Sequence, residues 1–359
     1  MLNFFTPKIS GFGIDLSDLS VKIVNLKKKR GKFFLTAFNR QEIKEGTIEE
    51  GEIKNEEALM EAIQKTLHEI KGQKIRNPYC IVSLPETESF VRLVTLPAMK
   101  PEEVTEAIKW ELEANIPLSV QEIYYDWQII DNLKPDAKQL DVLVGVLPKK
   151  TVDPYLEVLK KVGLKPFIFE IESLATARAL VPGGTSGRPL AILDFGAKRT
   201  SFFIFSGQAV FFTTSLPIGN NSMVKTLSEK LAISEQKALE IKIKVGIDVK
   251  RPQGAVFEAL RPAFTEMADK IKVFIDFYEN QRPADESKNQ INEVLLCGGG
   301  ANLTGLDEFL STQLKMTVRP GNPWVNITAN PKETVGKLPL DDPLAYATAL
   351  GLALRNFEK

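Results

Sequence analysis

Two short segments of the chain combine residues that could bind phosphate. In each, an apolar stretch typical of a β-strand ends in an aspartate, Asp15 or Asp194, and a polar turn and a second strand follow. Such a turn presents backbone N–H groups and hydroxyls to a terminal phosphate, and the aspartate can hold a hydrated Mg²⁺. The aspartates lie 179 residues apart (194 minus 15), half of the 359-residue chain, which indicates a duplicated unit.

Two further features support a ligand with phosphate groups and a flat ring. The second turn contains Gly196, which lets the backbone approach phosphates closely, and Thr200, which offers a hydroxyl. Glycines 298–300 lie between a predicted strand and a predicted helix and permit close approach to a ring such as adenosine. Each segment alone is a weak signal, because such turns are common in loops. Together they predict a nucleotide site.

The elements that position these segments are strands and helices in alternation. Three strands are predicted within residues 11–40, and three more at 190–194, 200–205 and 209–215. Asn55 is the expected N-cap of a helix over residues 55–71 that Gly72 ends, and a strand at 78–84 follows. Further helices are expected at 221–231, 234–245, 264–280, 306–314 and 343–356, with a strand at 293–297 before the glycines.

The middle of the first half contains a separate block of helices and strands. A strand at 90–96 precedes a helix that Pro101 opens and that buries Val104, Ile108 and Leu112. Trp110 falls off that apolar stripe, so it either covers the edge of the block or anchors a bound segment. Strands at 123–130 and 140–147 and a further helix complete an αβ unit.

These elements predict an α/β chain with two lobes and an inserted αβ subdomain. The predicted first lobe comprises residues 1–87 and 166–187, and the inserted subdomain comprises 88–165. The predicted second lobe comprises 188–220 and 291–359, with 221–290 as its helical subdomain.

Composition and charge exclude several classes of protein. Lys and Arg equal Asp and Glu at 46 each, so no global field attracts nucleic acid, and the basic run 27–30 is expected to be a solvated turn. With His68 as the only histidine, a histidine metal site and a Ser/His/Asp triad are both excluded. Cys80 and Cys297 lie in apolar strands and are expected to be buried thiols. No apolar stretch is long enough to span a bilayer, so we expect a cytoplasmic protein.

The order of phosphate loop, inserted block, second phosphate loop and Gly-Gly-Gly loop resembles the actin/Hsp70/sugar-kinase superfamily. More narrowly, residues 9–356 resemble the PilM family of type IV pilus assembly proteins, relatives of the cell-division protein FtsA. The most specific stretches are residues 13–22, 108–117, 193–201, 296–303 and 345–353. The resemblance implies an actin-like two-lobed ATPase fold of duplicated ribonuclease-H-like domains, with ATP and Mg²⁺ as cofactors.

The resemblance also assigns residues by position. The first phosphate loop would be Asp15, Ser17, Asp18 and Ser20, with Lys22 just beyond it. The second would be Asp194, Gly196, Ala197, Lys198 and Thr200. Adenosine would lie against Gly298, Gly299, Gly300 and Ala301, with Lys242 near the ribose and base. Asp15 and Asp194 would hold Mg²⁺ through water.

Two features limit the expected chemistry. The family usually has glycine where this chain has Ser17, and Asp18 adds a carboxylate near the phosphates, which is unfavourable unless Mg²⁺ or Lys22 offsets it. Glu172 matches the hinge position where an acidic residue can orient the attacking water, and a role at the N-terminus of the following helix is an equal alternative. We therefore expect ATP binding with at most weak hydrolysis.

The resemblance implies a partner, the N-terminal cytoplasmic tail of the inner-membrane protein PilN, along with other inner-membrane pilus assembly proteins. The chain ends just after its last predicted helix, without an FtsA-type amphipathic tail, so membrane association is expected through partners alone. Self-assembly is a further expectation. The alternatives are an FtsA-like or nucleotide-independent scaffold and, with less support, a small-molecule kinase of the sugar-kinase type.

Overall fold

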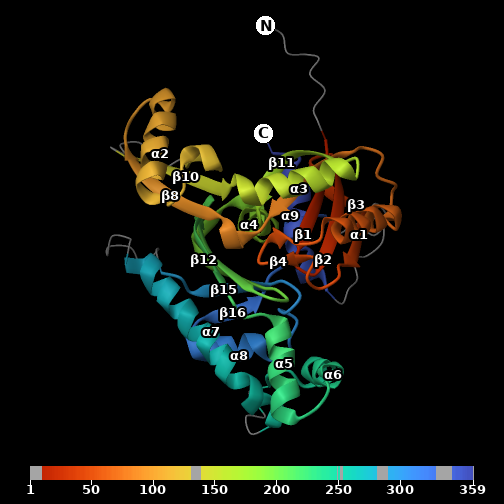
Figure 1. The fold of residues 1–359 in the computed structure, drawn as a ribbon. Helices are drawn as coiled ribbons and strands as arrows, with labels where there is room; N and C mark the ends of the chain where they lie inside the picture. The colour runs from red at the N-terminus through yellow and green to blue at the C-terminus, as the bar shows by residue number, and fades with distance from the viewer. Residues whose placement is uncertain are drawn as a thin grey trace.

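The computed structural model describes residues 10–130, 139–248, 250, 254–280, 290–328 and 342–358. The first nine residues of the predicted first lobe and residues 281–289 of the predicted helical subdomain lie outside the described residues. None of the described helices has the length and apolar composition needed to cross a bilayer. Figure 1 shows two lobes, with β1–β3 in one and α5–α8 in the other.

The first lobe is built on a six-stranded sheet in the order β11-β7-β1-β2-β3-β6. Its strands are β1 (Phe12–Ser17), β2 (Ser20–Lys29), β3 (Lys32–Glu42), β6 (Lys71–Gly72), β7 (Tyr79–Leu84) and β11 (Lys165–Ile171). β1 is antiparallel to β2 and parallel to β7, and helices cover both faces of the sheet at this strand, which explains why Phe12–Leu16 are all buried. A small hairpin, β4 (Ile48–Glu49) and β5 (Glu52–Ile53), lies beside this sheet.

Helix α1 (Glu56–His68) confirms one sequence prediction and corrects another. The Asn55 side chain caps the helix by accepting a hydrogen bond from the Ala58 N–H at 3.0 Å. The predicted extension to residue 71 is wrong, because the helix ends at His68. Gly72 does not end the helix but pairs with Ala37 as part of β6, an edge strand that the chain adds directly after the helix.

The second lobe repeats the order of the first. Its eight-stranded sheet runs β16-β15-β12-β13-β14-β8-β10-β9, so β16-β15-β12-β13-β14 corresponds to β11-β7-β1-β2-β3. The repeated strands are β12 (Ser186–Phe195), β13 (Thr200–Gly207), β14 (Ala209–Leu216), β15 (Glu293–Cys297) and β16 (Thr317–Pro320). This correspondence confirms that the chain contains a duplicated unit.

The block predicted as an insertion extends the second sheet. Its strands are β8 (Phe90–Pro97), β9 (Ile123–Ile130) and β10 (Gln139–Pro148), and its helices are α2 (Pro101–Asn115) and α3 (Lys149–Lys161). One backbone pairing, Phe212 with Arg92, joins β8 to β14. Val104, Ile108 and Leu112 of α2 are buried as predicted, whereas Trp110 is 71% exposed.

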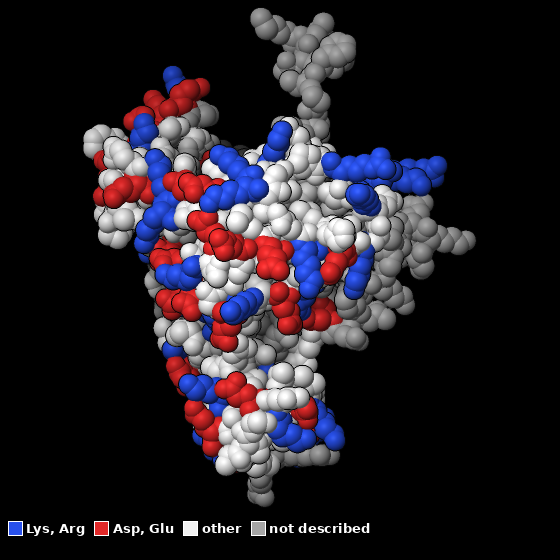
Figure 2. Space-filling view, turned by 45° about the vertical axis from the view of Figure 1, so that its right-hand side comes forward, with Lys and Arg blue, Asp and Glu red and all other residues white. Residues whose placement is uncertain are grey.

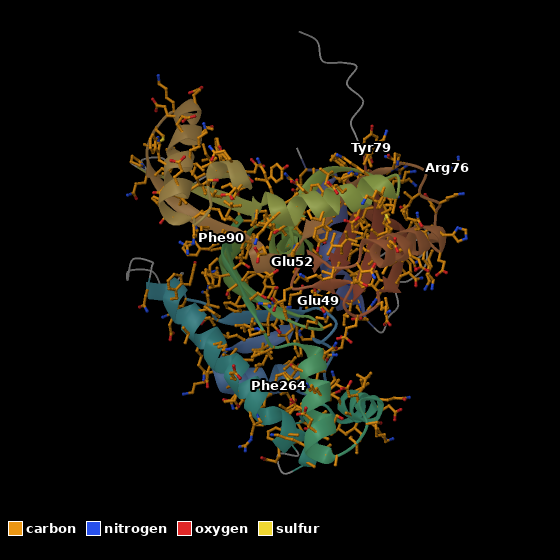
Figure 3. The ribbon with its side chains drawn as sticks, in the orientation of Figure 1. Glu49, Glu52, Arg76, Tyr79, Phe90 and Phe264 are labelled. Atoms are coloured by element: carbon orange, nitrogen blue, oxygen red, sulfur yellow. The ribbon has the colours of Figure 1, made fainter. Side chains whose placement is uncertain are left out.

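The remaining helices form the end of the second lobe and the junction between the lobes. They are α4 (Glu172–Leu180), α5 (Asn220–Leu231), α6 (Glu235–Val245), α7 (Ala255–Asn280), α8 (Leu306–Leu314) and α9 (Ala347–Arg355). Helix α7 begins at residue 255, nine residues before its predicted start, and contains Pro262. Phe264 of α7, labelled in Figure 3, packs against Phe195 and Phe309 in the core of this lobe.

Helices α4 and α9 cross at very short range between the two sheets. A Cβ atom on Gly351 of α9 would lie 1.7 Å from the carbonyl oxygen of Ala175 of α4. The buried Thr176 and Thr348 hydroxyls share a hydrogen bond of 2.9 Å across the same crossing. The absence of a side chain at residue 351 therefore permits the two helices to pack backbone to backbone.

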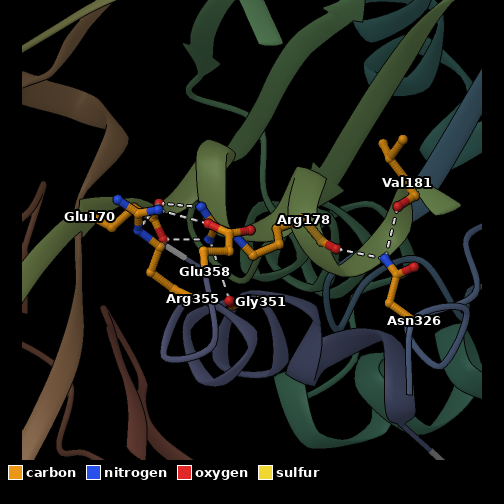
Figure 4. A network of polar contacts seen from close by, with 7 residues as sticks. All are labelled: Glu170, Arg178, Val181, Asn326, Gly351, Arg355 and Glu358. Carbon is orange, nitrogen blue, oxygen red and sulfur yellow. Dashed lines mark hydrogen bonds and ion pairs between the residues drawn. The ribbon is translucent and has the colours of Figure 1, made fainter. Parts of the chain in front are cut away.

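A charged network fixes the outer end of this crossing, as Figure 4 shows. The Arg178 guanidinium of α4 donates two hydrogen bonds of 2.6 Å to the Glu170 carboxylate of β11 and one of 2.7 Å to Glu358. Asn326 donates to the backbone carbonyls of Arg178 and Val181, which cap the end of α4. The negative charges of Glu170 and Glu358 strengthen these hydrogen bonds, so the end of α4 is held from several directions.

Candidate functional site

The two predicted phosphate turns meet at one cavity of about 170 Å³ between the lobes. Twelve of the predicted site residues line it: Asp15, Ser17, Asp18, Ser20, Lys22, Glu172, Asp194, Gly196, Ala197, Lys198, Gly298 and Gly299. The four predicted residues that are not among its lining are Thr200, Lys242, Gly300 and Ala301. The structure thus brings together segments that are far apart in the sequence.

The first turn closes without glycine. Asp18 and Leu19 join β1 to β2 as a two-residue turn, and neither has a positive φ angle. The Ser17 hydroxyl donates to the Ser20 carbonyl at 3.0 Å, and the two serine hydroxyls are also 3.0 Å apart. Serine at position 17 therefore creates no backbone strain, and its hydroxyl helps to close the turn.

Asp15 and Lys22 form a buried ion pair at the floor of the cavity. The Lys22 Nζ atom donates to Asp15 Oδ2 at 2.9 Å, and both side chains are less than a tenth exposed. Asp15 Oδ1 accepts from the Ser83 hydroxyl at 3.0 Å, and that hydroxyl accepts from the Leu16 N–H. Because β7 is parallel to β1, its end delivers Ser83 to the same place, and the Asp15 carboxylate is held in a fixed orientation.

The second turn brings Asp194 close to the glycine run. A Cβ atom on Gly298 would lie 2.2 Å from Asp194 Oδ1, and Gly298 has a φ angle of +82°, so this position requires glycine. A Cβ on Gly300 would lie 2.4 Å from the Phe195 ring, so a residue with a side chain could not pack against this ring in the same way. A Cβ on Gly299 would meet Asp342 Oδ2 and the Ala345 Cβ only at ordinary contact distances of 3.9 and 4.0 Å, and Gly299 lines the cavity.

Three predicted ligand residues that do not line the cavity, Thr200, Lys242 and Ala301, are buried within the second lobe. The buried Thr200 hydroxyl donates to the Ile218 carbonyl at 2.5 Å. Lys242 lies buried on α6, where its Nζ atom donates to the side-chain oxygen of Asn220, and burial lowers the pKa of this lysine to about 8. Ala301 is buried in the core of the second lobe.

Acidic groups dominate the electrostatics of the cavity. Burial raises the pKa of Asp194 to about 6, with Lys22 opposing and Asp15 and Glu86 adding to the shift. Burial likewise raises the pKa of Glu172 well above its ordinary value, and the negative charges around it add to this. Five carboxylates line the cavity (Asp15, Asp18, Glu86, Glu172 and Asp194) against four cations (Lys22, Arg40, Lys198 and Arg199). A divalent cation would therefore favour the binding of a polyphosphate in this cavity.

The predicted second carboxylate of the first turn faces cations of the second turn. Burial raises the pKa of Asp18, whereas Lys198, a backbone hydrogen bond at Gly51 and Arg199 lower it. Glu50 lies 3.5 Å from Arg199, so the hairpin β4–β5 also faces the second turn. Figure 3 shows Glu49 and Glu52 of this hairpin near the centre of the molecule, where the lobes face each other.

Glu86 is a cavity residue that the sequence analysis missed. It is 6% exposed and accepts hydrogen bonds from the Ser173 N–H at 3.1 Å, the Ser173 hydroxyl at 3.2 Å and the Thr213 hydroxyl. It therefore occupies the N-terminus of α4, the role considered for Glu172, although Glu172 is itself the first residue of that helix. The position of Glu86 directly after β7, parallel to the Asp15 strand, was the available signal.

The cavity could hold Mg²⁺ only with help from ligands outside the protein. Among the described residues, no three acidic, histidine or cysteine side chains lie close enough together to form a metal-ligand cluster. Asp15 and Asp194 both reach the cavity with carboxylate oxygens, the donors that Mg²⁺ prefers. These donors fit a cation that is completed by water and phosphate oxygens.

The duplicated sheets and the cavity between them define an actin-like fold. Solved structures of ethanolamine utilization protein EutJ from Carboxydothermus hydrogenoformans and of MreB5 from Spiroplasma citri bound to ADP share it, each with a TM-score of 0.55. The EutJ match has 16% identity and covers 97% of this chain and 90% of that one. The MreB5 match has 12% identity and covers 97% and 96%.

Within this class the chain belongs to the family of the type IV pilus assembly protein PilM, whose sequence model matches residues 13–357. A structure described as the PilM-PilN type IV pilus biogenesis complex matches with a TM-score of 0.82 and 24% identity, covering 98% of this chain and 100% of that one. The cell-division protein FtsA of Pseudomonas aeruginosa is 22% identical over 229 residues, 56% of this chain and 50% of FtsA. The chain thus spans about half the length of the curated relatives it matches.

Proposed function

We propose that this protein is an ATP-binding adaptor for type IV pilus assembly. The observation that carries the proposal is the meeting of both Asp turns and Gly298–Gly299 at one cavity between the lobes. Family membership supports the pilus role, and the MreB5 structure with ADP supports a nucleotide in this fold. We place the protein in the cytoplasm, peripheral to the inner membrane through its partners.

The chain offers a separate group for each part of a bound ATP. The backbone of the two turns and the Lys22 and Lys198 side chains would hold the phosphates. Asp15 and Asp194 would hold the Mg²⁺ that offsets their own charge and that of Asp18. The open face of Gly299 would approach the adenosine. Lys242 would reach the ribose and base only after giving up Asn220.

Hydrolysis is the weaker part of the proposed function. A residue that positions or deprotonates the attacking water must be ionised, and burial beside other carboxylates raises the pKa of Glu172 well above its ordinary value, which opposes its ionisation. Bound Mg²⁺ would lower that pKa, because a cation stabilises a nearby carboxylate. We therefore propose at most weak ATPase activity, with Glu172 acting only in the Mg-ATP complex.

The proposed partner is the N-terminal cytoplasmic tail of PilN. The similar structure of a PilM-PilN complex supports this partner, and membership of a pilus assembly family supports contacts with other inner-membrane pilus proteins. Binding of the tail and of ATP would be coupled, because α4 lines the cavity with Glu172 and also packs on β11 and β7 of the first lobe. Such coupling is reciprocal: ATP changes the affinity for the tail by the same factor that the tail changes the affinity for ATP.

Fluorescence anisotropy with a labelled PilN-tail peptide tests this proposal. We expect the peptide to bind the wild-type protein, with a different affinity when Mg-ATP is added, and we expect Asp194→Ala to bind the peptide but to lose the ATP effect. Peptide binding that ignores ATP would favour the nucleotide-independent scaffold. No peptide binding would remove the adaptor role, and phosphate transfer in a screen of small-molecule acceptors would favour a kinase.

A further inference from the structure

Arg40 is a cavity cation that neither the sequence analysis nor the family resemblance assigned. On three adjacent antiparallel strands, Asp15 pairs with Lys22 and Lys22 pairs with Arg40. Because paired residues point to the same face of a sheet, the three side chains form a row across the strands on one face. All three line the cavity, with Arg40 at the end of the row farthest from the Asp15 carboxylate.

The Arg40 guanidinium is held by a carboxylate that lies beside the glycine loop. Its Nη1 atom donates to Asp342 Oδ2 at 2.9 Å, and Asp342 Oδ1 accepts from the Asn302 amide at 3.1 Å. A Cβ atom on Gly299 would lie 3.9 Å from the same Asp342 Oδ2. The Arg40–Asp342 pair therefore connects a cavity residue of the first lobe to the surroundings of the glycine loop.

The Arg40–Asp342 pair is more accessible to solvent than the Asp15–Lys22 pair. The Arg40 side chain is 36% exposed and the Asp342 side chain is 27% exposed, whereas Lys22 and Asp15 are 9% and 4% exposed. A solvent-accessible ion pair contributes little stability, typically below ~1 kcal/mol, so breaking it costs little. A guanidinium also binds phosphate in a bidentate manner, with better geometry than an ammonium group.

We propose that Arg40 is a phosphate ligand of the bound nucleotide and that Asp342 holds it while the cavity is empty. This inference rests on the proposed function and deepens it. A nucleoside di- or triphosphate that lies between the Asp15–Lys22 pair and Gly299 passes Arg40 and competes with Asp342 for its guanidinium. Arg40 then recognises phosphate, and Asp342 acts as an internal competitor that weakens nucleotide binding.

Calorimetry with ADP, ATP and adenosine tests this assignment in the presence of Mg²⁺. For Arg40→Gln we expect affinity for ADP and ATP to fall about tenfold or more, since charge-assisted hydrogen bonds to phosphate are among the stronger ones, and affinity for adenosine to stay within about twofold. For Asp342→Asn we expect tighter binding of ADP, because the competitor for Arg40 loses its charge. Arg319→Gln is the matched control, since Arg319 pairs with Glu293 on β15–β16 away from the cavity lining.

The outcomes separate this assignment from the proposed function. Equal affinity of wild type and Arg40→Gln for ADP would overturn the assignment alone. Equal losses in Arg40→Gln and Asp342→Asn would also overturn it, because they would show that the pair serves to close the cleft. Absence of any nucleotide binding by the wild-type protein would overturn the proposed function, and the assignment with it.

Discussion

Replacing Gly351 with alanine tests the crossing of α4 and α9 that joins the two lobes. The new Cβ would lie 1.7 Å from the Ala175 carbonyl oxygen, and ordinary contact requires at least 3.4 Å, so the helices must separate by about 1.7 Å (3.4 minus 1.7). The position of the new Cβ is fixed by the backbone of α9 and the atom that it meets is a backbone oxygen, so no side-chain rotation can relieve the clash. The buried hydrogen bond between Thr176 and Thr348 would be stretched by the same movement.

Three contributions determine how Gly351→Ala changes the free energy of unfolding. Alanine is favoured over glycine within a helix by about 1 kcal/mol. Overpacking costs about 3 kcal/mol when the neighbour cannot move aside, and loss of the threonine hydrogen bond costs about 1 kcal/mol. The net expectation for Gly351→Ala is therefore a loss of about 3 kcal/mol in the free energy of unfolding, opposite in sign to helix propensity.

Urea denaturation followed by circular dichroism measures this change. Gly187→Ala is the matched control, because a Cβ there meets no heavy atom within 4 Å, and we expect it to remain within about 0.5 kcal/mol of wild type. Since α4 begins at Glu172 in the cavity, nucleotide affinity should fall together with stability in Gly351→Ala. A Gly351→Ala protein as stable as wild type would refute the reasoning about this crossing.

Three further predictions concern the cavity and α2. Because burial raises the pKa of Asp194 to about 6 in the folded state, from an ordinary 3.8, its ionisation destabilises the fold as pH rises through that range. Asp194→Asn should thus be more stable than wild type by about 3 kcal/mol at pH 8 and nearly equal to it near pH 4 in thermal melts, and a constant difference would contradict this. Lys22→Met leaves Asp15 buried without its partner and should lower the free energy of unfolding by about 3–5 kcal/mol. In a double-mutant cycle, adding Asp15→Asn to this variant should restore at least half of that loss. Trp110→Ala removes a side chain that is 71% exposed and should change stability by less than about 0.5 kcal/mol, so a larger loss in urea denaturation would show that it covers a core.

Much of the fold was predictable because its signals are local. The apolar strand runs before Asp15 and Asp194 predicted the repeated unit, and the two matching strand orders confirm it. The Asn55 cap and the buried stripe of α2 follow from spacing within one helix turn or two. The end of α1 was missed because the edge strand at Gly72 depends on pairing with β3, which no local pattern records.

The parts of the site that were missed depend on contacts between distant segments. Glu86 accepts a hydrogen bond from Thr213, 127 residues away, and Arg40 donates one to Asp342, 302 residues away. Neither residue has a turn or glycine motif beside it that would mark a phosphate site. Only the strand register, which places Arg40 beside Lys22, shows why a residue of β3 belongs to the cavity.

The distribution of charged side chains differs between the surface and the cavity. In the view of Figure 2, Lys and Arg side chains alternate with Asp and Glu side chains, without a broad area of one sign. The cavity differs from this surface because its acidic groups outnumber its basic ones, five to four. Binding of a polyphosphate should consequently depend on divalent cation more strongly than on ionic strength.

We propose that the cavity between the lobes binds ATP and that Asp15 and Asp194 hold its Mg²⁺. Isothermal titration calorimetry of the wild-type protein with ATP, with Mg²⁺ and with EDTA in its place, tests this claim most directly. We expect binding with Mg²⁺, little or none with EDTA, and loss of the Mg²⁺ effect in Asp194→Ala. No heat of binding at millimolar Mg-ATP, or equal affinity with and without the cation, would contradict it.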